Sequence, residues 1–144
     1  MQIGVETSKA VDQRRVFVVD EDEITRAALQ FMLHDEIETH ELATPEEAYE
    51  KGQGWLMPHV ILLGVGLLKA RGDALIGEMK TKFPGVRILI VTDKSEEAVA
   101  VSGLKAGAHG AVVKPLTLEG VRKKVDTVLG RDGGAQLVQL SVMK

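Results

Sequence analysis

The sequence contains no cysteine and few aromatic residues, and both absences exclude classes of function. Without cysteine, the 144-residue chain can form no disulfide, no thiolate metal site and no cysteine nucleophile. A reducing compartment, the cytoplasm, is therefore the expected location. The aromatic residues are one Trp, one Tyr and three Phe, scattered along the chain. So few rings predict no stacking surface for single-stranded nucleic acid.

Neither sign of charge dominates, and long apolar runs are also missing. Eighteen Lys and Arg stand against 21 Asp and Glu, a net charge of −3, which offers no basic footprint for a phosphate backbone. No stretch reaches the roughly 18 apolar residues of a membrane span, and the opening residues lack the apolar run of a signal peptide. We therefore expect no direct contact with nucleic acid and no membrane segment. An apolar share of 44% indicates one ordinary globular domain.

Two apolar patterns alternate along the chain. Short runs rich in β-branched residues predict buried strands at 16–19, 37–42, 60–63, 86–91 and 111–113. Apolar residues three and four apart predict a helix after each strand. The first helical stripe consists of Ile24, Ala27, Ala28, Phe31 and Met32. The later helices are expected from residue 45 to 52 or 54 and at 75–83, 95–106 and 121–129, and residues 64–73 are interpreted as a loop.

Five repeats of strand and helix define the expected fold class. Strands that are apolar on both faces indicate a parallel sheet covered by helices on both sides. The prediction is an α/β, flavodoxin-like, doubly wound sheet with strand order 2-1-3-4-5. Residues 14–129 form the domain, residues 1–13 a flexible leader, and residues 130–144 a linker and tail.

Polar residues follow the strands at the edge where this fold forms its crevice. They are Asp20 and Glu21 after the first strand, Gly64 after the third, Thr92 after the fourth and Lys114 after the fifth. The surrounding motifs are FVVDED at 17–22, ILLGVGLLKARG at 61–72, ILIVTD at 88–93 and GAVVKPL at 110–116. Together, over residues 14–129, they resemble the receiver domain of two-component response regulators.

The resemblance implies a role for each of these positions. Asp20 and Glu21 match the acidic pair that holds Mg²⁺, and Thr92 matches the residue that hydrogen-bonds an incoming phosphoryl group. Lys114 matches the lysine that pairs with the phosphorylated aspartate, and its bond to Pro115 is expected to be cis. These positions form the expected phosphorylation pocket.

One position departs from the family's pattern: Gly64 stands where the aspartate nucleophile belongs. Glycine has no side-chain oxygen to attack phosphorus or to bind a metal, so any Mg²⁺ held by Asp20 and Glu21 is weak at best. The expected function is that of a pseudo-receiver in two-component or phosphorelay signalling, which needs no cofactor and is not an enzyme. Its partner would be a histidine kinase, an output domain, a scaffold or a second copy of the chain.

The resemblance also implies a contact surface on the last helices and strand. In this chain that face is expected to present Val99, Ala100, Gly103, Ala111 and Lys124. Gly103 lowers helix stability by up to about 1 kcal/mol relative to Ala, and close approach of another backbone is the simplest reason for it. Ala111 stands where the family usually has a switch aromatic, so the phosphorylation relay lacks this residue as well.

Several alternatives remain open from the sequence. The chain could be a phosphotransfer or phosphatase enzyme using a displaced aspartate, Asp22 or Asp73, or a variant of an ordinary response regulator altered at Gly64. Lys114 could pair directly with the acids at 20 and 21 and hold the pocket shut. The Gly64–Gly66 segment is not interpreted as a phosphate loop, because it lacks the Gly-Lys-Ser/Thr that follows in a P-loop and because no helix is expected directly after it. Trp55 is interpreted as a packing residue rather than a partner anchor.

Overall fold

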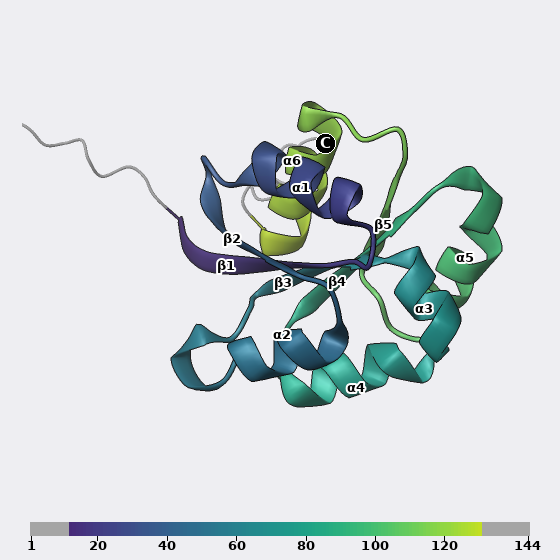
Figure 1. The fold of residues 1–144 in the computed structure, drawn as a ribbon, viewed down its shortest axis with the longest axis horizontal. Coiled ribbons are helices and arrows are strands. Elements are labelled where there is room, and N and C mark those ends of the chain that lie inside the picture. The colour runs from purple at the N-terminus through teal and green to yellow at the C-terminus, as the bar shows by residue number, and fades with distance from the viewer. Residues whose placement is uncertain (1–11, 131–144) are drawn as a thin grey trace, which may run out of the picture.

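The computed structural model of the chain describes residues 12–130, and its centre is a five-stranded parallel sheet in the order β2-β1-β3-β4-β5 (Figure 1). The predicted strand order is confirmed. The strands are β1 (Asp12–Val19), β2 (Ile37–Leu42), β3 (Val60–Gly64), β4 (Arg87–Thr92) and β5 (Gly110–Val113). The α-helices are α1 (Glu23–Leu33), α2 (Pro45–Lys51), α3 (Val65–Arg71), α4 (Ala74–Lys82), α5 (Glu97–Lys105) and α6 (Leu118–Leu129). Two 3-10 turns, η2 (Gly54–Leu56) and η3 (Lys94–Glu96), precede β3 and α5.

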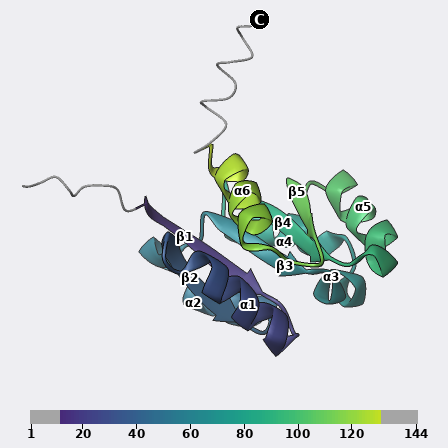
Figure 2. The ribbon, with the colours of Figure 1, turned by 90° about the horizontal axis from the view of Figure 1, so that it is seen from above.

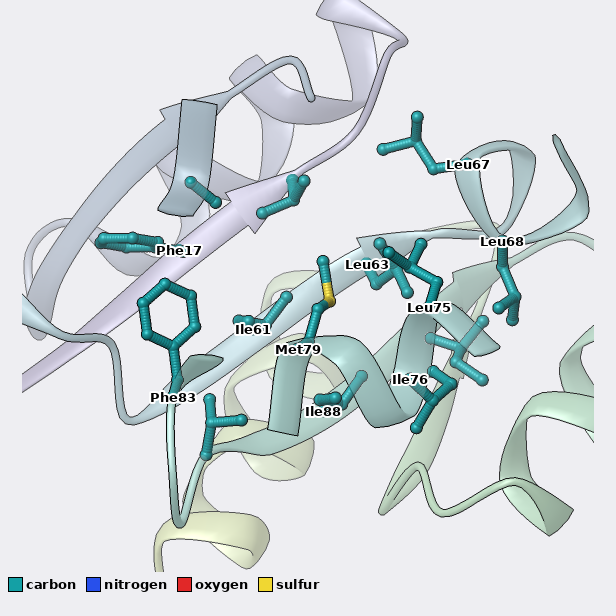
Figure 3. Close-up of a cluster of buried hydrophobic side chains, with 14 of the residues drawn as sticks. Phe17, Ile61, Leu63, Leu67, Leu68, Leu75, Ile76, Met79, Phe83 and Ile88 are labelled. Atoms are coloured by element: carbon teal, nitrogen blue, oxygen red, sulfur yellow. The ribbon is translucent and has the colours of Figure 1, made fainter. Parts of the chain in front are cut away.

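Each face of the sheet carries its own apolar core. Helices α1 and α6 lie side by side on one face, over a cluster that includes Val18, Leu62 and Val112 (Figures 1 and 2). The opposite face packs against α2, α3, α4 and α5, where Phe17, Ile61 and neighbouring side chains form a continuous apolar layer (Figure 3). Successive strand residues point to opposite faces, which is why the middle segments of the central strands, residues 16–19, 60–63 and 88–91, are apolar at every position.

The segment after β3 is a helix rather than the expected loop. Helix α3 begins at Val65, directly after the strand, and ends at Arg71, with Gly72 (φ +88°) as its C-cap. Its buried residues, Leu67 and Leu68, join the core of that face. The two glycines and the cluster of charges suggested a loop, but the burial of two adjacent leucines stabilises a helical turn there. The expectation that no helix follows Gly64 was therefore wrong.

The first helix exists as predicted, but it presents a different face to the sheet. Its buried residues are Thr25, Leu29 and Leu33, whereas Ile24 is 80% exposed and Phe31 is 73% exposed. Helix α1 carries apolar residues on two faces, and both have helical spacing. Contact with the sheet, and not the spacing, selects the face that contains Leu29.

Gly103 faces the interior, which corrects the expectation that it lies on a contact surface. A Cβ atom built at Gly103 would lie 2.6 Å from Ile90 Cδ1 and 2.7 Å from Leu68 Cδ2. Ala100, one turn earlier, is only 3% exposed. The glycine therefore allows α5 to approach β4 and α3 within the domain, and no second backbone is needed to explain it.

We expect Gly103→Ala and Gly77→Ala to change stability in opposite directions. Gly77 lies inside α4, and nothing stands within 4 Å of a Cβ atom built there, so alanine should stabilise the protein by about 0.5–1 kcal/mol. At Gly103 the same gain is opposed by overpacking of about 1–3 kcal/mol, for a net loss of up to about 2 kcal/mol. Urea unfolding of both variants measures the difference, and equal shifts would contradict this account of Gly103.

The boundaries of the domain are described only in part. β1 begins at Asp12, two residues before the predicted start at 14, and α6 ends at Leu129 with Gly130 as its left-handed cap. The rest of the expected leader and tail, residues 1–11 and 131–144, lies outside the described residues. Within residues 12–130, no helix combines the length and the hydropathy that crossing a membrane requires.

Candidate functional site

The carboxyl edge of the sheet gathers the residues predicted to form a pocket. Asp20 follows β1, Gly64 ends β3, Thr92 ends β4 and Lys114 follows β5. The parallel register of β1, β3, β4 and β5 places these strand ends next to one another. The Lys114–Pro115 peptide bond is cis, as predicted. The sequence therefore identified neighbours in space that are up to 94 residues apart in the chain, from 20 to 114.

The carboxylate of Asp20 fills the space that a side chain at position 64 would need. Cγ, Oδ1 and Oδ2 of Asp20 all lie within 2.7 Å of the place where a Cβ atom on Gly64 would stand. Asp20 is 6% exposed, and its Oδ1 accepts a hydrogen bond of 2.9 Å from the backbone N–H of Asp22. The absence of a side chain at Gly64 thus makes room for the acid of the neighbouring strand.

Glu21 lies over the second glycine of the same segment. Its Oε2 is 2.6 Å from the position of a Cβ atom built on Gly66, in the first turn of α3. Unlike Asp20, Glu21 is exposed. Both members of the acidic pair therefore extend from the end of β1 toward glycines at the end of β3 and the start of α3.

Lys114 does not form the direct ion pair that the sequence suggested. Its ammonium group donates to Thr25 Oγ1 at 3.0 Å, and Thr25 in turn donates to Asp22 Oδ2 at 2.6 Å. Among residues 12–130, no carboxylate oxygen lies within 4.0 Å of the Lys114 ammonium. Sequence reasoning missed Thr25, although it stands one helical turn after the N-cap residue Asp22, which was a usable signal.

The remaining polar groups at this edge also have partners within the chain. Asp22 is the N-cap of α1, where its carboxylate accepts from the backbone N–H of Ile24 at 3.2 Å. The hydroxyl of Thr92 donates to the backbone carbonyl of Asp93 at 2.9 Å, and Thr92 is fully buried. Across the described residues, no group of three or more His, Asp or Glu side chains is arranged to hold a metal ion.

The pKa values of the two neighbouring aspartates shift in opposite directions, for different reasons. Burial raises the pKa of the Asp20 carboxyl above its ordinary value of 3.8, although the Asp22 N–H and the charge of Lys114 act against this rise. The hydrogen bond from Thr25 lowers the pKa of the exposed Asp22 carboxyl. The site therefore retains a carboxylate whose charged form the protein disfavours, and this is a cost to stability at neutral pH.

We expect Asp20→Asn to stabilise the protein at pH 7, by on the order of 1 kcal/mol. The folded state binds the Asp20 proton more tightly than the unfolded state does. The stability that comes from this tighter proton binding is fully present below the pKa of Asp20 in the unfolded chain. It is lost as pH rises through the pKa of Asp20 in the folded chain. An asparagine keeps the acceptor for the Asp22 N–H without the charge. Urea titrations at a series of pH values from about 3 to 7, a range that includes the ordinary pKa of Asp, measure the effect.

The variant and the parent should therefore converge in stability at the acidic end of that series. Asp22→Asn is the matched control, because the pKa of Asp22 is lowered and its contribution is lost as pH falls. That variant should lose stability at neutral pH. A loss of stability at pH 7 on Asp20→Asn would mean that the Asp20 charge stabilises the fold.

Other residues proposed from the sequence lie elsewhere on the molecule. Val99 and Ala111 are half-buried and Lys124 is exposed, whereas Ala100 and Gly103 belong to the interior, as described above. The carboxylate of Asp73 accepts from the hydroxyl of Ser102 on α5. The surface expected on the last helices and strand therefore consists of fewer residues than the sequence suggested.

A parallel sheet in the order 2-1-3-4-5, with an acidic pair after β1 and a Lys–cis-Pro bond after β5, defines a flavodoxin-like fold with its polar site at the carboxyl edge. The family model of the response regulator receiver domain matches residues 16–126 of this chain. The chain belongs to this family. As a response regulator receiver domain it has its place in two-component signalling.

Curated relatives and solved structures agree with this assignment. The chain is 29% identical over 124 residues to the transcriptional regulatory protein CreB of Escherichia coli, with 84% of the chain and 53% of CreB covered. It is 26% identical over 117 residues to LnrK of Bacillus subtilis, with 79% and 53% covered. The receiver domain of NtrX from Brucella abortus shares the fold with a TM-score of 0.72 at 24% identity, over 80% of this chain and 98% of that domain.

The chain spans about half the length of these two curated relatives. Both are named as transcriptional regulatory proteins, so the relatives give no support to the expectation of no direct contact with nucleic acid. A cyclic di-GMP phosphodiesterase of Thermotoga maritima is also similar, at 28% identity over 115 residues, but the match covers 30% of that protein.

Proposed function

We propose that this chain is a pseudo-receiver, a receiver domain that is not phosphorylated and that signals through contact with protein partners. One observation carries the proposal: β3 ends in Gly64, and the Asp20 carboxylate fills the space of the missing side chain. A glycine provides no oxygen to attack the phosphorus of a phosphohistidine. Phosphoryl transfer to this strand end therefore has no acceptor.

The hydrogen bonds around Gly64 support the same proposal. The groups that would contact a phosphoryl group in a family member are bonded within the chain: Lys114 to Thr25, and Thr92 to the carbonyl of Asp93. These two groups therefore have partners without a ligand.

Mg²⁺ binding is weak at best in this proposal. Mg²⁺ prefers six oxygen ligands in octahedral geometry and releases its waters reluctantly. Asp20 and Glu21 would be its ligands here, and position 64 offers no third carboxylate. Because the pKa of Asp20 is raised, protons compete with Mg²⁺ for this carboxylate at a higher pH than at an ordinary aspartate. The chain is proposed to need no cofactor and to have no enzymatic activity.

The partners that fit this role are proteins of a signalling pathway: a histidine kinase, an output domain or a scaffold. The net charge of −3 gives no basic surface, so we propose that any effect on nucleic acid is indirect. The half-buried Val99 and Ala111 and the exposed Lys124 remain the family-based candidates for the contact surface.

The test is the intact mass of the chain after treatment with acetyl phosphate and Mg²⁺. The expected result is no gain of a phosphoryl group. A second candidate function, a phosphotransfer enzyme using Asp22 or Asp73, predicts a labelled peptide containing one of these residues. Because both carboxylates are already hydrogen-bonded within the chain, we expect neither to be labelled. An acyl phosphate on any aspartate would overturn the pseudo-receiver proposal.

A further inference from the structure

The only tryptophan of the sequence lies almost fully in solvent. Trp55 is 85% exposed, in the turn η2 between α2 and β3. This corrects the interpretation of Trp55 as a packing residue. A tryptophan side chain has a large apolar area and is frequently a hot spot at protein interfaces, so its exposure on this turn calls for an explanation.

A buried arginine holds this turn in place. The guanidinium Nη1 of Arg15 donates to the backbone carbonyls of both Trp55 and Met57, each at 3.1 Å. Arg15 is itself fixed by Glu38, whose Oε2 lies 2.5 Å from its Nε, and the hydrogen bond from Arg15 lowers the pKa of Glu38 to about 2. The exposed indole is thus carried by a braced backbone, which reduces the entropy that binding would remove.

A hollow of about 530 Å³ opens beside the turn that carries Trp55. Its lining includes the aromatic rings of Tyr49 and Phe83, the side chain of Met57 and the backbone of Gly52. The rings are tilted, with centroids 5.9 Å apart, and Phe83 occupies the space that a side chain on Gly52 would need. Because Phe83 is only 2% exposed, Tyr49 and Met57 supply most of the apolar surface of the hollow, which has room for an indole ring.

The same small surface contains both an aromatic projection and an aromatic hollow. Gly54 and Met57, on either side of the turn that carries Trp55, line the hollow. The rim carries both signs of charge, with Glu50 on one element and Lys82 on another, and the Lys82 ammonium lies 5.4 Å from the centre of the Tyr49 ring. An interface with two-fold symmetry requires such a patch, because each copy must supply both complementary parts.

We propose that two copies of this chain associate through this patch, with Trp55 of each copy entering the hollow of the other. Each inserted tryptophan buries about 150–250 Å², and the exposed lining of each hollow adds less than that. The total stays below about 1,000 Å² and so below that of standard stable interfaces. The association is therefore weak and depends on protein concentration.

This contact leaves the candidate functional site uncovered. The segment between α2 and β3 lies at the amino end of the strands, whereas Asp20 and Lys114 lie at the carboxyl end (Figure 1). Association through Trp55 does not depend on the phosphorylation state of the chain or on the pseudo-receiver proposal. The two proposals can therefore fail separately.

The experiment is sedimentation equilibrium of the 144-residue chain over a concentration series, combined with its tryptophan fluorescence. Because Trp55 is the only tryptophan, the emission reports on this residue alone. The expected result is a monomer–dimer equilibrium in which the emission shifts to shorter wavelength as the dimer forms. Trp55→Ala should weaken association at least about 100-fold. Gln53→Phe, which places a ring at the lining of the hollow, should weaken it as well.

Phe31→Ala is the matched control, because it removes another exposed aromatic side chain from a different layer and should leave association unchanged. Circular dichroism should show that all three variants are folded, as expected for exposed positions. A chain that remains monomeric at every concentration overturns the proposal. It does so even if Trp55 binds a different partner. Association that persists in Trp55→Ala, or that is unaffected by Gln53→Phe, overturns it as well.

Discussion

Gly64→Asp is expected to convert a chain that binds neither Mg²⁺ nor beryllofluoride measurably into one that binds both. The substitution adds a third carboxylate at the end of β3, beside Asp20 and Glu21, with Thr92 and Lys114 already at the same edge. Losing even an indirect partner of a metal ligand commonly costs 10–100-fold in affinity. A restored direct ligand should therefore raise Mg²⁺ affinity by at least about tenfold.

The gain requires Asp20 to move. Its carboxylate occupies the space of the new Cβ atom, but it is the end of a side chain with two rotatable bonds and can turn toward a bound cation. Gly64→Ala is the matched control, because it displaces Asp20 in the same way and adds no oxygen. Calorimetric titration is the suitable measurement, since Trp55 lies at the opposite end of the strands and is a poor reporter of this site.

Two other outcomes would be informative. If neither variant binds, displacement of Asp20 has closed the pocket, and the missing carboxylate is not the only change from an active receiver. If Gly64→Ala binds as well as Gly64→Asp, the position of Asp20 and not the missing ligand limits binding in the parent chain. Only binding by the aspartate variant alone fits the account given above.

Phe17→Ala should cause the largest loss of stability of any single substitution considered for this chain. Phe17 is fully buried on β1, where its ring meets the edge of Phe83 at a centroid distance of 6.1 Å and that of His40 at 5.8 Å. Removing such a ring leaves a cavity that neighbouring strands cannot close, at a cost of about 3–5 kcal/mol. Urea unfolding followed by circular dichroism measures the loss.

Phe31→Ala is the matched substitution at the surface. Because Phe31 is largely exposed on α1, its removal should change stability by less than about 0.5 kcal/mol. Similar losses in the two variants would show that the Phe31 ring packs against the domain in solution and would contradict the described orientation of α1.

The fold was predictable because its signals are local and repeated. Five apolar runs and the helical spacings between them are sufficient to predict a parallel sheet, and the preference for right-handed crossovers leaves few strand orders. The order 2-1-3-4-5 is confirmed. The position of the site followed from the same reasoning, since residues after parallel strands must meet at one edge.

Orientation and short-range geometry could not be predicted in the same way. Helix α1 carries two apolar faces, and only contact with the sheet selects the one with Leu29 over the one with Phe31. Helix α3 forms where glycines suggested a loop, because burial of two leucines outweighs weak local propensity. Gly103 is required by two side chains from distant parts of the sequence, Leu68 and Ile90.

The sequence alone therefore determined the fold class, the strand order and the absence of a carboxylate at position 64. Each of these depends on residue type and spacing along the chain. Only the tertiary structure decided that Asp20 fills the space beside Gly64, that Lys114 bonds to Thr25 and that Trp55 stays in solvent. These facts depend on side-chain directions and on contacts between segments far apart in the chain, and neither residue type nor spacing specifies them.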